Sequence, residues 1–169
     1  SFPLYVKIAA QLGLSPVFAD VESQHLNVDP EKIRKAITKE TKAVVLTHLF
    51  GHPAQIENIK KITDQFGIPI IEDCAQSYDS FFREKETGTT GWVGIFSCSL
   101  MKVPTTLGGG VVLTKDKELA RKIRTTVKKV YTSRKKRGAT SYHAKGLVSV
   151  LNSYPVLYSL ISHQVFGLI

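Results

Sequence analysis

Four residues with reactive or hydrogen-bonding side chains occur in a fixed order along the middle of the chain. They are Asp73 and Gln76 in the segment EDCAQ, Ser97 in IFSCS, and Lys102, five residues after Ser97. The runs that precede Asp73 and Ser97 are short, apolar and rich in β-branched residues, as buried parallel strands are. Ligands bind at the carboxyl ends of such strands. We therefore expect an acid, a hydroxyl and an amine to converge at one edge of a sheet.

Each of these side chains has a role that suits pyridoxal phosphate. A carboxylate such as Asp73 beside the pyridine nitrogen keeps that nitrogen protonated and makes the ring an electron sink. A lysine in a partly desolvated pocket can lose its proton near neutral pH, form a Schiff base with the aldehyde and later move a proton, and Lys102 is the candidate for this role. The hydroxyl of Ser97 suits a phosphate oxygen, and Gln76 suits the ring or its hydroxyl. The set predicts a site with Lys102 as the catalytic residue and all four residues as cofactor ligands.

Each residue taken alone has a simpler explanation. An acid at a strand end, such as Asp73, more often caps a helix or carries a surface charge. A lone lysine is usually solvated, and Ser97 and Gln76 individually indicate nothing. Only their combination at one predicted sheet edge favours a cofactor site.

The segments that must position these residues alternate between helix and strand. Periodic apolar spacing predicts helices over 4–12, 55–66 and 117–130, and Asp29 followed by Pro30 predicts the start of another through Ile37. Strands are expected over 17–21, 43–46, 68–72, 92–96 and 111–114, with a loop or hairpin over 83–91. Ile56, Ile59, Ile62 and Phe66 should share the buried face of a crossover helix that ends at Gly67. This order predicts an α/β fold built from βαβ units.

Several longer segments resemble one known family. They are PVFADV at 16–21, NVDPEKIRKAIT at 27–38, TKAVVLTHLFGHPAQI at 41–56, IPIIEDCAQSY at 68–78 and GIFSCSLMK at 94–102. In this order they are similar to the DegT/DnrJ/StrS family of sugar-nucleotide aminotransferases. The resemblance implies the three-layer α/β/α large domain of a fold type I pyridoxal phosphate-dependent transferase, related to aspartate aminotransferase and here incomplete at both ends.

The resemblance also implies roles for the four residues. Asp73 takes the position of the pyridinium partner, Gln76 of a ring contact, Ser97 of a phosphate ligand and Lys102 of the Schiff-base lysine. The implied reaction moves an amino group from glutamate to a nucleotide-linked keto sugar, in polysaccharide or amino-sugar biosynthesis, within a homodimer. Some members carry histidine in place of the lysine and are sugar dehydratases, so Lys102 favours transamination.

The chain departs from the family pattern at several positions. Family members usually have an aromatic residue at the position of Cys98, a glycine near Asp79, an acid at Trp92 and a glutamate within the cluster LGGG. None of these differences removes a group that carries the chemistry. An upstream phosphate-binding loop and a downstream sugar-binding domain are also expected in the family. The chain thus resembles a fragment, and the alternatives are a catalytically incomplete relative or a dehydratase.

Composition agrees with one α/β core domain. The 169 residues are 43% hydrophobic and 22% charged, which is ordinary for a globular protein. Cys74 and Cys98 lie in apolar contexts without metal-ligand spacing, so we expect small buried side chains. The five histidines form no metal-binding pattern, and no metal site is predicted. A reducing cytoplasm is the expected compartment.

The C-terminal part differs in character from the rest. We expect a cofactor-binding core over 1–130, followed over 131–169 by a basic linker and an apolar helical segment. The net charge of +9 is concentrated between Lys128 and Arg137, and 146–169 is largely apolar. A basic run is usually solvated, and no nucleic-acid partner is expected. Polar residues and Pro155 within the apolar segment favour a buried or interface helix over a membrane anchor formed by 128–169, which stays an alternative.

Overall fold

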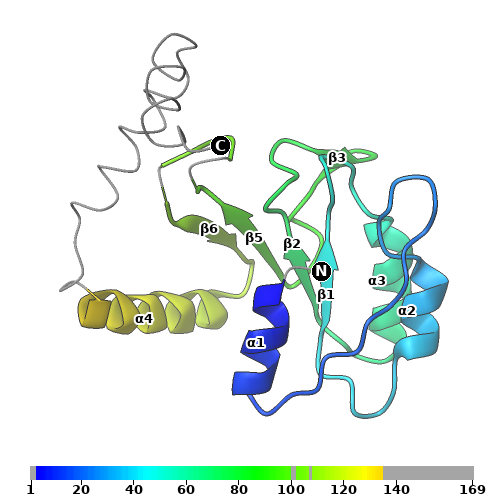
Figure 1. Ribbon diagram of the computed structural model, residues 1–169, viewed down its shortest axis with the longest axis horizontal. Helices are drawn as coiled ribbons and strands as arrows, with labels where there is room; N and C mark the ends of the chain where they lie inside the picture. The colour runs from blue at the N-terminus through cyan, green and yellow to red at the C-terminus, as the bar shows by residue number, and fades with distance from the viewer. Residues whose placement is uncertain (1–2, 100–101, 107, 135–169) are drawn as a thin grey trace, which may run out of the picture. The chain divides into compact units, whose positions relative to one another are not determined.

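The computed structural model describes residues 3–99, 102–106 and 108–134 (Figure 1). Its helices are α1 (Pro3–Gln11), α2 (Pro30–Ala36), α3 (Ile56–Gln65) and α4 (Lys117–Arg134), and its strands are β1 (Val44–Thr47), β2 (Ile70–Asp73), β3 (Phe81–Phe82), β4 (Lys85–Glu86), β5 (Val93–Ser97) and β6 (Gly110–Leu113). The chain divides into two compact units. Of the described residues, 3–96 and 111–117 belong to the first unit, and those within 97–110 and 118–134 belong to the second.

The main sheet has the strand order β1-β2-β5-β6. β1, β2 and β5 run parallel, and their register aligns Thr47 with Asp73 and Asp73 with Ile95. The crossover from β1 to β2 passes through α3, as a parallel pair requires. β3 and β4 form a separate antiparallel hairpin within the predicted loop or hairpin. The predicted α/β architecture with βαβ units is confirmed.

The core of the first unit lies between the sheet and the helix pair α2 and α3. Six buried apolar side chains form it: Ile33, Leu46, Ala54, Ile56, Ile59 and Ile70. Because side chains alternate along a strand, Ile70 and Glu72 face these helices whereas Ile71 and Asp73 face the other side of the sheet. Figure 1 shows α1 on the opposite side of β1 from α2 and α3. The end of β2 therefore presents its two acids to opposite layers.

Two helix boundaries follow the sequence signals. The Asp29 carboxylate accepts a hydrogen bond from the N–H of Glu31 at 2.8 Å, and Pro30 is the first residue of α2, so the predicted cap is confirmed. Gly13 follows α1 with φ of 69°, a left-handed conformation that glycine adopts without steric cost. Local capping thus determines where these helices begin or end.

Two expectations about apolar segments are wrong. Residues 17–21 form no sheet strand: Val21 makes only an isolated bridge with Val28, and Val17 is 74% exposed. Phe66 is 54% exposed, and the buried face of α3 consists of Ile56, Ile59 and Thr63. α3 ends at Gln65, so Phe66 leaves the helical stripe, and Thr63 takes the inward position one turn earlier.

The segments that the sequence singled out after α4 lie outside the described residues. α4 itself continues to Arg134, and the predicted boundary between 130 and 131 stays a prediction. Within the described part of the chain, no helix combines the length and the apolar character needed to cross a membrane.

A glycine in β5 allows the loop after β4 to lie against the sheet. A Cβ atom at Gly94 would lie 2.3 Å from the carbonyl oxygen and 2.5 Å from the Cα of Gly88. Since backbone cannot move aside without disrupting the loop, Gly94→Ala is expected to lower the free energy of unfolding by about 3 kcal/mol. Urea denaturation measures this effect.

Gly67 provides the matched control for this substitution. Its φ is 64° and nothing lies within 4 Å of an added Cβ, so Gly67→Ala carries only the backbone strain, about 1 kcal/mol. Equal losses for the two variants would show that contact with Gly88 is not what restricts position 94.

Candidate functional site

The carboxyl end of β2 carries two adjacent buried acids. Glu72 is fully buried and Asp73 is 6% exposed. Their side chains point to opposite faces of the sheet, so the two carboxylates meet different surroundings. The difference between these surroundings determines which acid can accept a hydrogen bond from a bound ligand.

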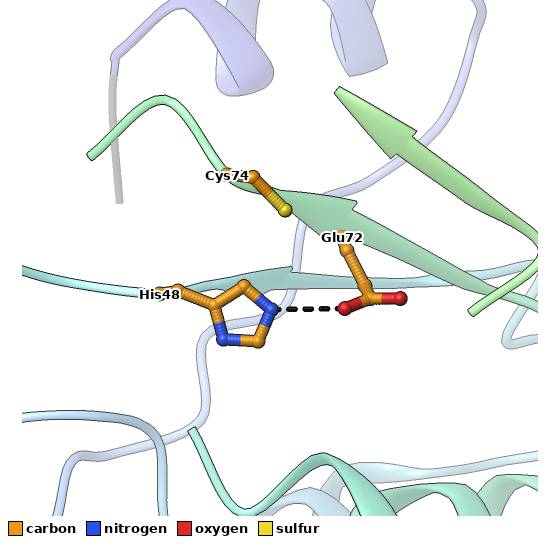
Figure 2. A group of neighbouring side chains, drawn as sticks. All are labelled: His48, Glu72 and Cys74. Carbon is orange, nitrogen blue, oxygen red and sulfur yellow. Dashed lines mark hydrogen bonds and ion pairs between the residues drawn. The ribbon is translucent and has the colours of Figure 1, made fainter. Parts of the chain in front are cut away.

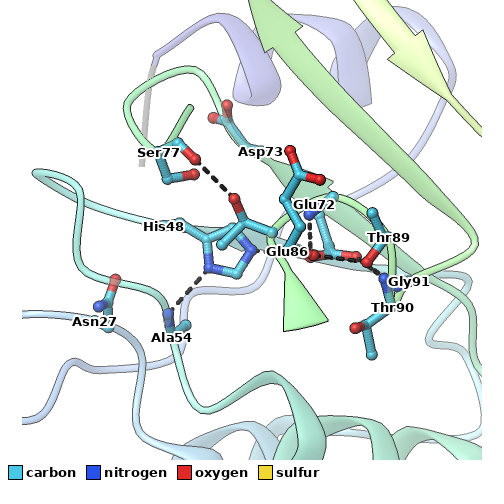
Figure 3. A network of polar contacts seen from close by, with 12 residues as sticks. Asn27, His48, Ala54, Glu72, Asp73, Ser77, Glu86, Thr89, Thr90 and Gly91 are labelled. Atoms are coloured by element: carbon cyan, nitrogen blue, oxygen red, sulfur yellow. Dashed lines mark hydrogen bonds and ion pairs between the residues drawn. The ribbon is translucent and has the colours of Figure 1, made fainter. Parts of the chain in front are cut away.

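Glu72 is saturated with hydrogen bonds from the protein (Figure 3). Its carboxylate accepts from the backbone N–H groups of Gly88 at 2.8 Å, Thr90 at 2.9 Å and Gly91. The Nε2 atom of His48 lies 3.1 Å from the same carboxylate. Four donors leave Glu72 no capacity for a ligand, and the contacts tie the loop after β4 to β2.

His48 has a defined tautomer within this network. Its Nδ1 accepts a hydrogen bond from the N–H of Ala54 at 3.0 Å, so the ring proton is on Nε2, which donates to Glu72. His48 is therefore a neutral imidazole that joins the segment before α3 to the end of β2.

His48, Glu72 and Cys74 place three possible metal-binding atoms within 4.8 Å of one another (Figure 2). Such a donor set could suit zinc. Both ring nitrogens of His48 are already engaged, however, and the carboxylate of Glu72 is saturated. Burial, followed by the charge of Glu72, raises the pKa of the Cys74 thiol to about 12, which disfavours the thiolate that a metal needs. The cluster is part of the buried network.

The predicted character of both cysteines is confirmed. Cys74 is 1% exposed and Cys98 is 6% exposed, and both are free thiols. They act as small buried side chains.

The environment of Glu72 predicts an effect of pH on stability. Burial alone raises the pKa of Glu72, but the hydrogen bonds from His48, Gly91 and Gly88 outweigh it and hold that pKa below its ordinary value of 4.5. The unfolded chain therefore binds the proton more tightly than the folded chain. The stabilisation is fully present above about pH 4.5 and is lost as the pH falls through the lower folded-state pKa.

Glu72→Gln tests this network. The amide nitrogen of glutamine would face backbone N–H donors, so we expect a loss of about 3 kcal/mol at neutral pH and a flatter stability profile below pH 5. Urea denaturation at a series of pH values measures both. Exposed Glu40 is the control, and Glu40→Gln should change stability by less than about 0.5 kcal/mol. An unchanged acid profile in Glu72→Gln would contradict the role of Glu72.

Asp73 differs from Glu72 because its carboxylate keeps free acceptor capacity. Its Oδ1 accepts from the N–H of Ala75 at 3.0 Å. On α1, burial followed by the nearby charge of Asp73 raises the pKa of the Tyr5 hydroxyl. A carboxylate has about four lone-pair directions, so a further donor can be accommodated. A buried acid at the carboxyl end of a parallel strand, with acceptor sites left, fits the partner of a protonated ring nitrogen.

Gln76 lies just beyond Asp73, in the turn after β2, with its side chain exposed. Its Oε1 accepts the N–H of Phe50 at 3.2 Å, so it contacts the loop after β1. Phe50 has φ of 54° and is 69% exposed, an unfavourable conformation for a bulky residue. The loops after β1 and β2 are thus linked at the sheet edge that carries Asp73.

Asn27 holds the loop after β1 in place, a role that the sequence did not predict. It is 2% exposed, and its Oδ1 accepts the N–H of Leu49 at 3.1 Å while its Nδ2 donates to the carbonyl of His52 at 2.9 Å. This amide fixes both ends of the loop that contains Phe50. Its only sequence signal was an asparagine two residues before a helix cap, which equally indicates an ordinary turn.

Ser97 and Lys102 belong to the second unit. Ser97 is the last residue of β5, and its hydroxyl donates to the Oγ of Ser99 at 3.2 Å. The carbonyl of Ser99 accepts from the N–H of Lys102 at 2.9 Å and from the hydroxyl of Thr105 at 2.9 Å. One turn therefore holds Ser97 and the half-buried Lys102. Asp73 and Gln76 lie in the first unit, and the convergence of all four residues stays a prediction.

The sequence profile of the DegT/DnrJ/EryC1/StrS aminotransferase family matches residues 1–151. A curated relative, the L-glutamine:2-deoxy-scyllo-inosose aminotransferase of Streptomyces kanamyceticus, is 43% identical over 108 residues. The match covers 64% of this chain and 25% of the relative. The chain thus spans about a quarter of the length of the curated relatives it matches.

Solved structures resemble the fold as well. The aminotransferase TlmJ from Streptoalloteichus hindustanus has a TM-score of 0.71 and 34% identity over 73% of this chain and 34% of its own. DesI, solved with its TDP-sugar product, has a TM-score of 0.69 and 32% identity over 73% and 32%. GDP-4-keto-6-deoxy-D-mannose-3-dehydratase from E coli, solved with bound hydrated PLP, has a TM-score of 0.66 and 33% identity over 70% and 30%.

The fold is therefore part of that of the fold type I pyridoxal phosphate-dependent aminotransferases. The chain belongs to the DegT/DnrJ/EryC1/StrS aminotransferase family, as its sequence landmarks predicted.

Proposed function

We propose that this chain forms the cofactor-binding part of a pyridoxal phosphate-dependent transaminase that aminates a keto sugar. The observation that carries the proposal is Asp73, a buried carboxylate at the carboxyl end of β2 whose acceptor capacity is left partly open by the described residues. Family membership and a structural relative solved with PLP support the choice of cofactor.

Each of the four predicted residues would have a separate role. Bound pyridoxal phosphate supplies an aldehyde that takes up an amine and a ring that accepts an electron pair. Asp73 would hold the proton on the ring nitrogen, and Gln76 would contact the ring. Ser97 would donate its hydroxyl proton to a phosphate oxygen. Lys102 would hold the aldehyde carbon through its Nζ and, once the donor amine displaces it, move a proton between carbon atoms.

The substrate of this proposal is a nucleotide-linked keto sugar, with glutamate as donor, in polysaccharide or amino-sugar biosynthesis. A TDP-sugar product in one structural relative and a GDP-sugar in the name of another support the nucleotide. A second candidate acceptor is a keto-cyclitol without a nucleotide, with glutamine as donor, because the 43% identical relative is named for that pair.

A transamination assay tests the proposal. The chain is loaded with pyridoxal phosphate and incubated with glutamate or glutamine and with a TDP-linked 4-keto sugar or 2-deoxy-scyllo-inosose, and mass spectrometry detects the product. An aminated product supports the proposal, and the productive acceptor identifies the substrate class. Loss of a hydroxyl without amination would favour the dehydratase alternative.

A homodimer that completes the site, and a cytoplasmic location, belong to the same proposal. A catalytically incomplete relative is the remaining alternative. Cofactor uptake without turnover for any donor and acceptor would favour it over an active transaminase.

A further inference from the structure

The loop after β1 places an exposed aromatic residue next to two of the predicted cofactor ligands. The N–H of His48 donates to the carbonyl of Asp73 at 3.0 Å, so the loop leaves the sheet beside the end of β2. Further along this loop, the N–H of Phe50 donates to the Oε1 of Gln76 at 3.2 Å. Phe50 is nevertheless 69% exposed. Its backbone is therefore fixed at the carboxyl edge of the sheet, whereas its side chain is not part of the core.

Phe50 occupies a turn position that disfavours a bulky side chain. The N–H of His52 donates to the carbonyl of Leu49 at 2.8 Å, which closes the turn. The two central residues are Phe50, with φ of 54°, and Gly51, with φ of 78°. Positive φ at both central residues is typical of type I′ turns, in which asparagine, aspartate and glycine are preferred. A phenylalanine at this position carries backbone strain that its exposed side chain does not offset by burial.

Other parts of the chain hold this turn in its strained conformation. The buried amide of Asn27 accepts the N–H of Leu49 at 3.1 Å and donates to the carbonyl of His52 at 2.9 Å, and Gln76 accepts the N–H of Phe50 between them. Both ends and the centre of the turn are thus hydrogen-bonded from outside it. Strained residues persist where the surroundings fix them in this way, and they cluster at binding sites.

We propose that Phe50 determines acceptor specificity by stacking its aromatic ring against the six-membered ring of the keto acceptor. The inference rests on the proposed function, because Asp73 and Gln76 must face the cofactor. Both candidate acceptors, the nucleotide-linked keto sugar and the keto-cyclitol, contain such a ring, whose C–H groups form apolar faces between polar hydroxyl edges. An aromatic side chain covers an apolar face of this kind and leaves the hydroxyl groups to polar partners. This use of the ring explains why the turn carries a phenylalanine where asparagine would be unstrained.

The first test measures the strain in the 169-residue chain without ligands. Phe50→Asn keeps the turn, because asparagine tolerates a positive φ, and removes the ring. Urea denaturation should show an unfolding equilibrium constant about fivefold lower than that of the parent chain. Phe66→Asn is the control and should not stabilise the chain, because Phe66 is also exposed but has an ordinary φ of −105°. A destabilised Phe50→Asn would overturn the inference, since the ring would then serve the fold.

The second test measures acceptor binding. The chain is loaded with pyridoxal phosphate and titrated, without an amino donor, with a TDP-linked 4-keto sugar in one arm and 2-deoxy-scyllo-inosose in the other. Isothermal titration calorimetry should show about tenfold weaker binding in Phe50→Asn, for the acceptor that the parent chain binds, and unchanged affinity for the cofactor. Phe50→Leu should also bind the acceptor more weakly, because leucine keeps the backbone strain but has no flat aromatic face.

Phe66→Asn is the control for binding as well. Phe66 follows α3 and precedes β2, so it lies toward the amino end of that strand, away from Asp73. Its substitution should leave the affinity for the acceptor at the parent value. An equal loss in Phe66→Asn would overturn the specific role of Phe50.

The outcomes separate this inference from the proposed function. Parent-level affinity for the acceptor in Phe50→Asn or in Phe50→Leu overturns the stacking role and leaves the proposed function intact. Weaker binding of the cofactor, with no change for the acceptor, also overturns it, because the ring would then contact the cofactor. A parent chain that takes up the cofactor but neither acceptor overturns the inference and the choice of acceptor. A parent chain that takes up no cofactor contradicts the proposed function, and the inference fails with it.

Discussion

Lys102→Ala is expected to abolish covalent capture of pyridoxal phosphate and to lower transamination by about 10³-fold or more. In the proposed mechanism, the lysine amine would bind the aldehyde carbon with loss of water and would later move a proton between carbons. Alanine supplies neither function. Lys102 lies in the turn that Ser99 holds, and it is half-buried rather than fully solvated.

Absorption spectroscopy followed by borohydride reduction and peptide mass mapping measures the capture. The parent chain should carry the reduced cofactor on the peptide that contains Lys102, and the variant should carry none. Lys115→Ala is the matched control, because Lys115 is exposed and is the next lysine along the chain. Undiminished turnover in Lys102→Ala would show that this lysine takes no part in the mechanism. Labelling on Lys115 would show that Lys115 carries the cofactor instead.

Asp73→Asn is expected to reduce turnover by about 10²-fold or more while the fold is retained. Asparagine keeps the shape of the side chain and can still accept the N–H of Ala75, but it carries no charge to hold a proton on the ring nitrogen. In the proposed role of Asp73, the loss should appear in kcat, because the ring would be a weaker electron sink in the transition state.

Steady-state kinetics and urea denaturation together check this expectation. Asp79→Asn is the control, because Asp79 is exposed and asparagine tolerates its φ of 54°. That variant should keep both turnover and stability. Parent-level kcat in Asp73→Asn would count against the ring-partner role, and an unfolded variant would show that the carboxylate is needed for folding instead.

The sequence alone determined the kinds of element and most of their order. Asp29 with Pro30 marks the start of α2 because its carboxylate satisfies a backbone donor that no helical partner reaches. The apolar runs before Asp73 and Ser97 predicted β2 and β5 because a parallel strand is buried on both faces. These signals are local. The family landmarks added the prediction of a cofactor and of roles for four residues.

Features that depend on packing between segments far apart in the sequence were predicted less accurately. The segment 17–21 has the composition of a strand, but no sheet edge pairs with it beyond the bridge at Val21. Phe66 fits the apolar period of α3, yet the helix ends one residue earlier and Thr63 fills the buried position. Periodicity indicates which residues can share a face, whereas the neighbouring elements determine which of them are covered.

Only the tertiary structure decided between the two acids at the end of β2. In sequence Glu72 and Asp73 are adjacent carboxylates, but the side on which α2 and α3 pack places Glu72 against His48 and the loop from Gly88 to Gly91. Asp73 is left on the opposite face, where its carboxylate accepts the N–H of Ala75 in the turn after β2. Strand alternation makes the two acids face opposite ways, and long-range packing determines which one keeps free acceptor sites.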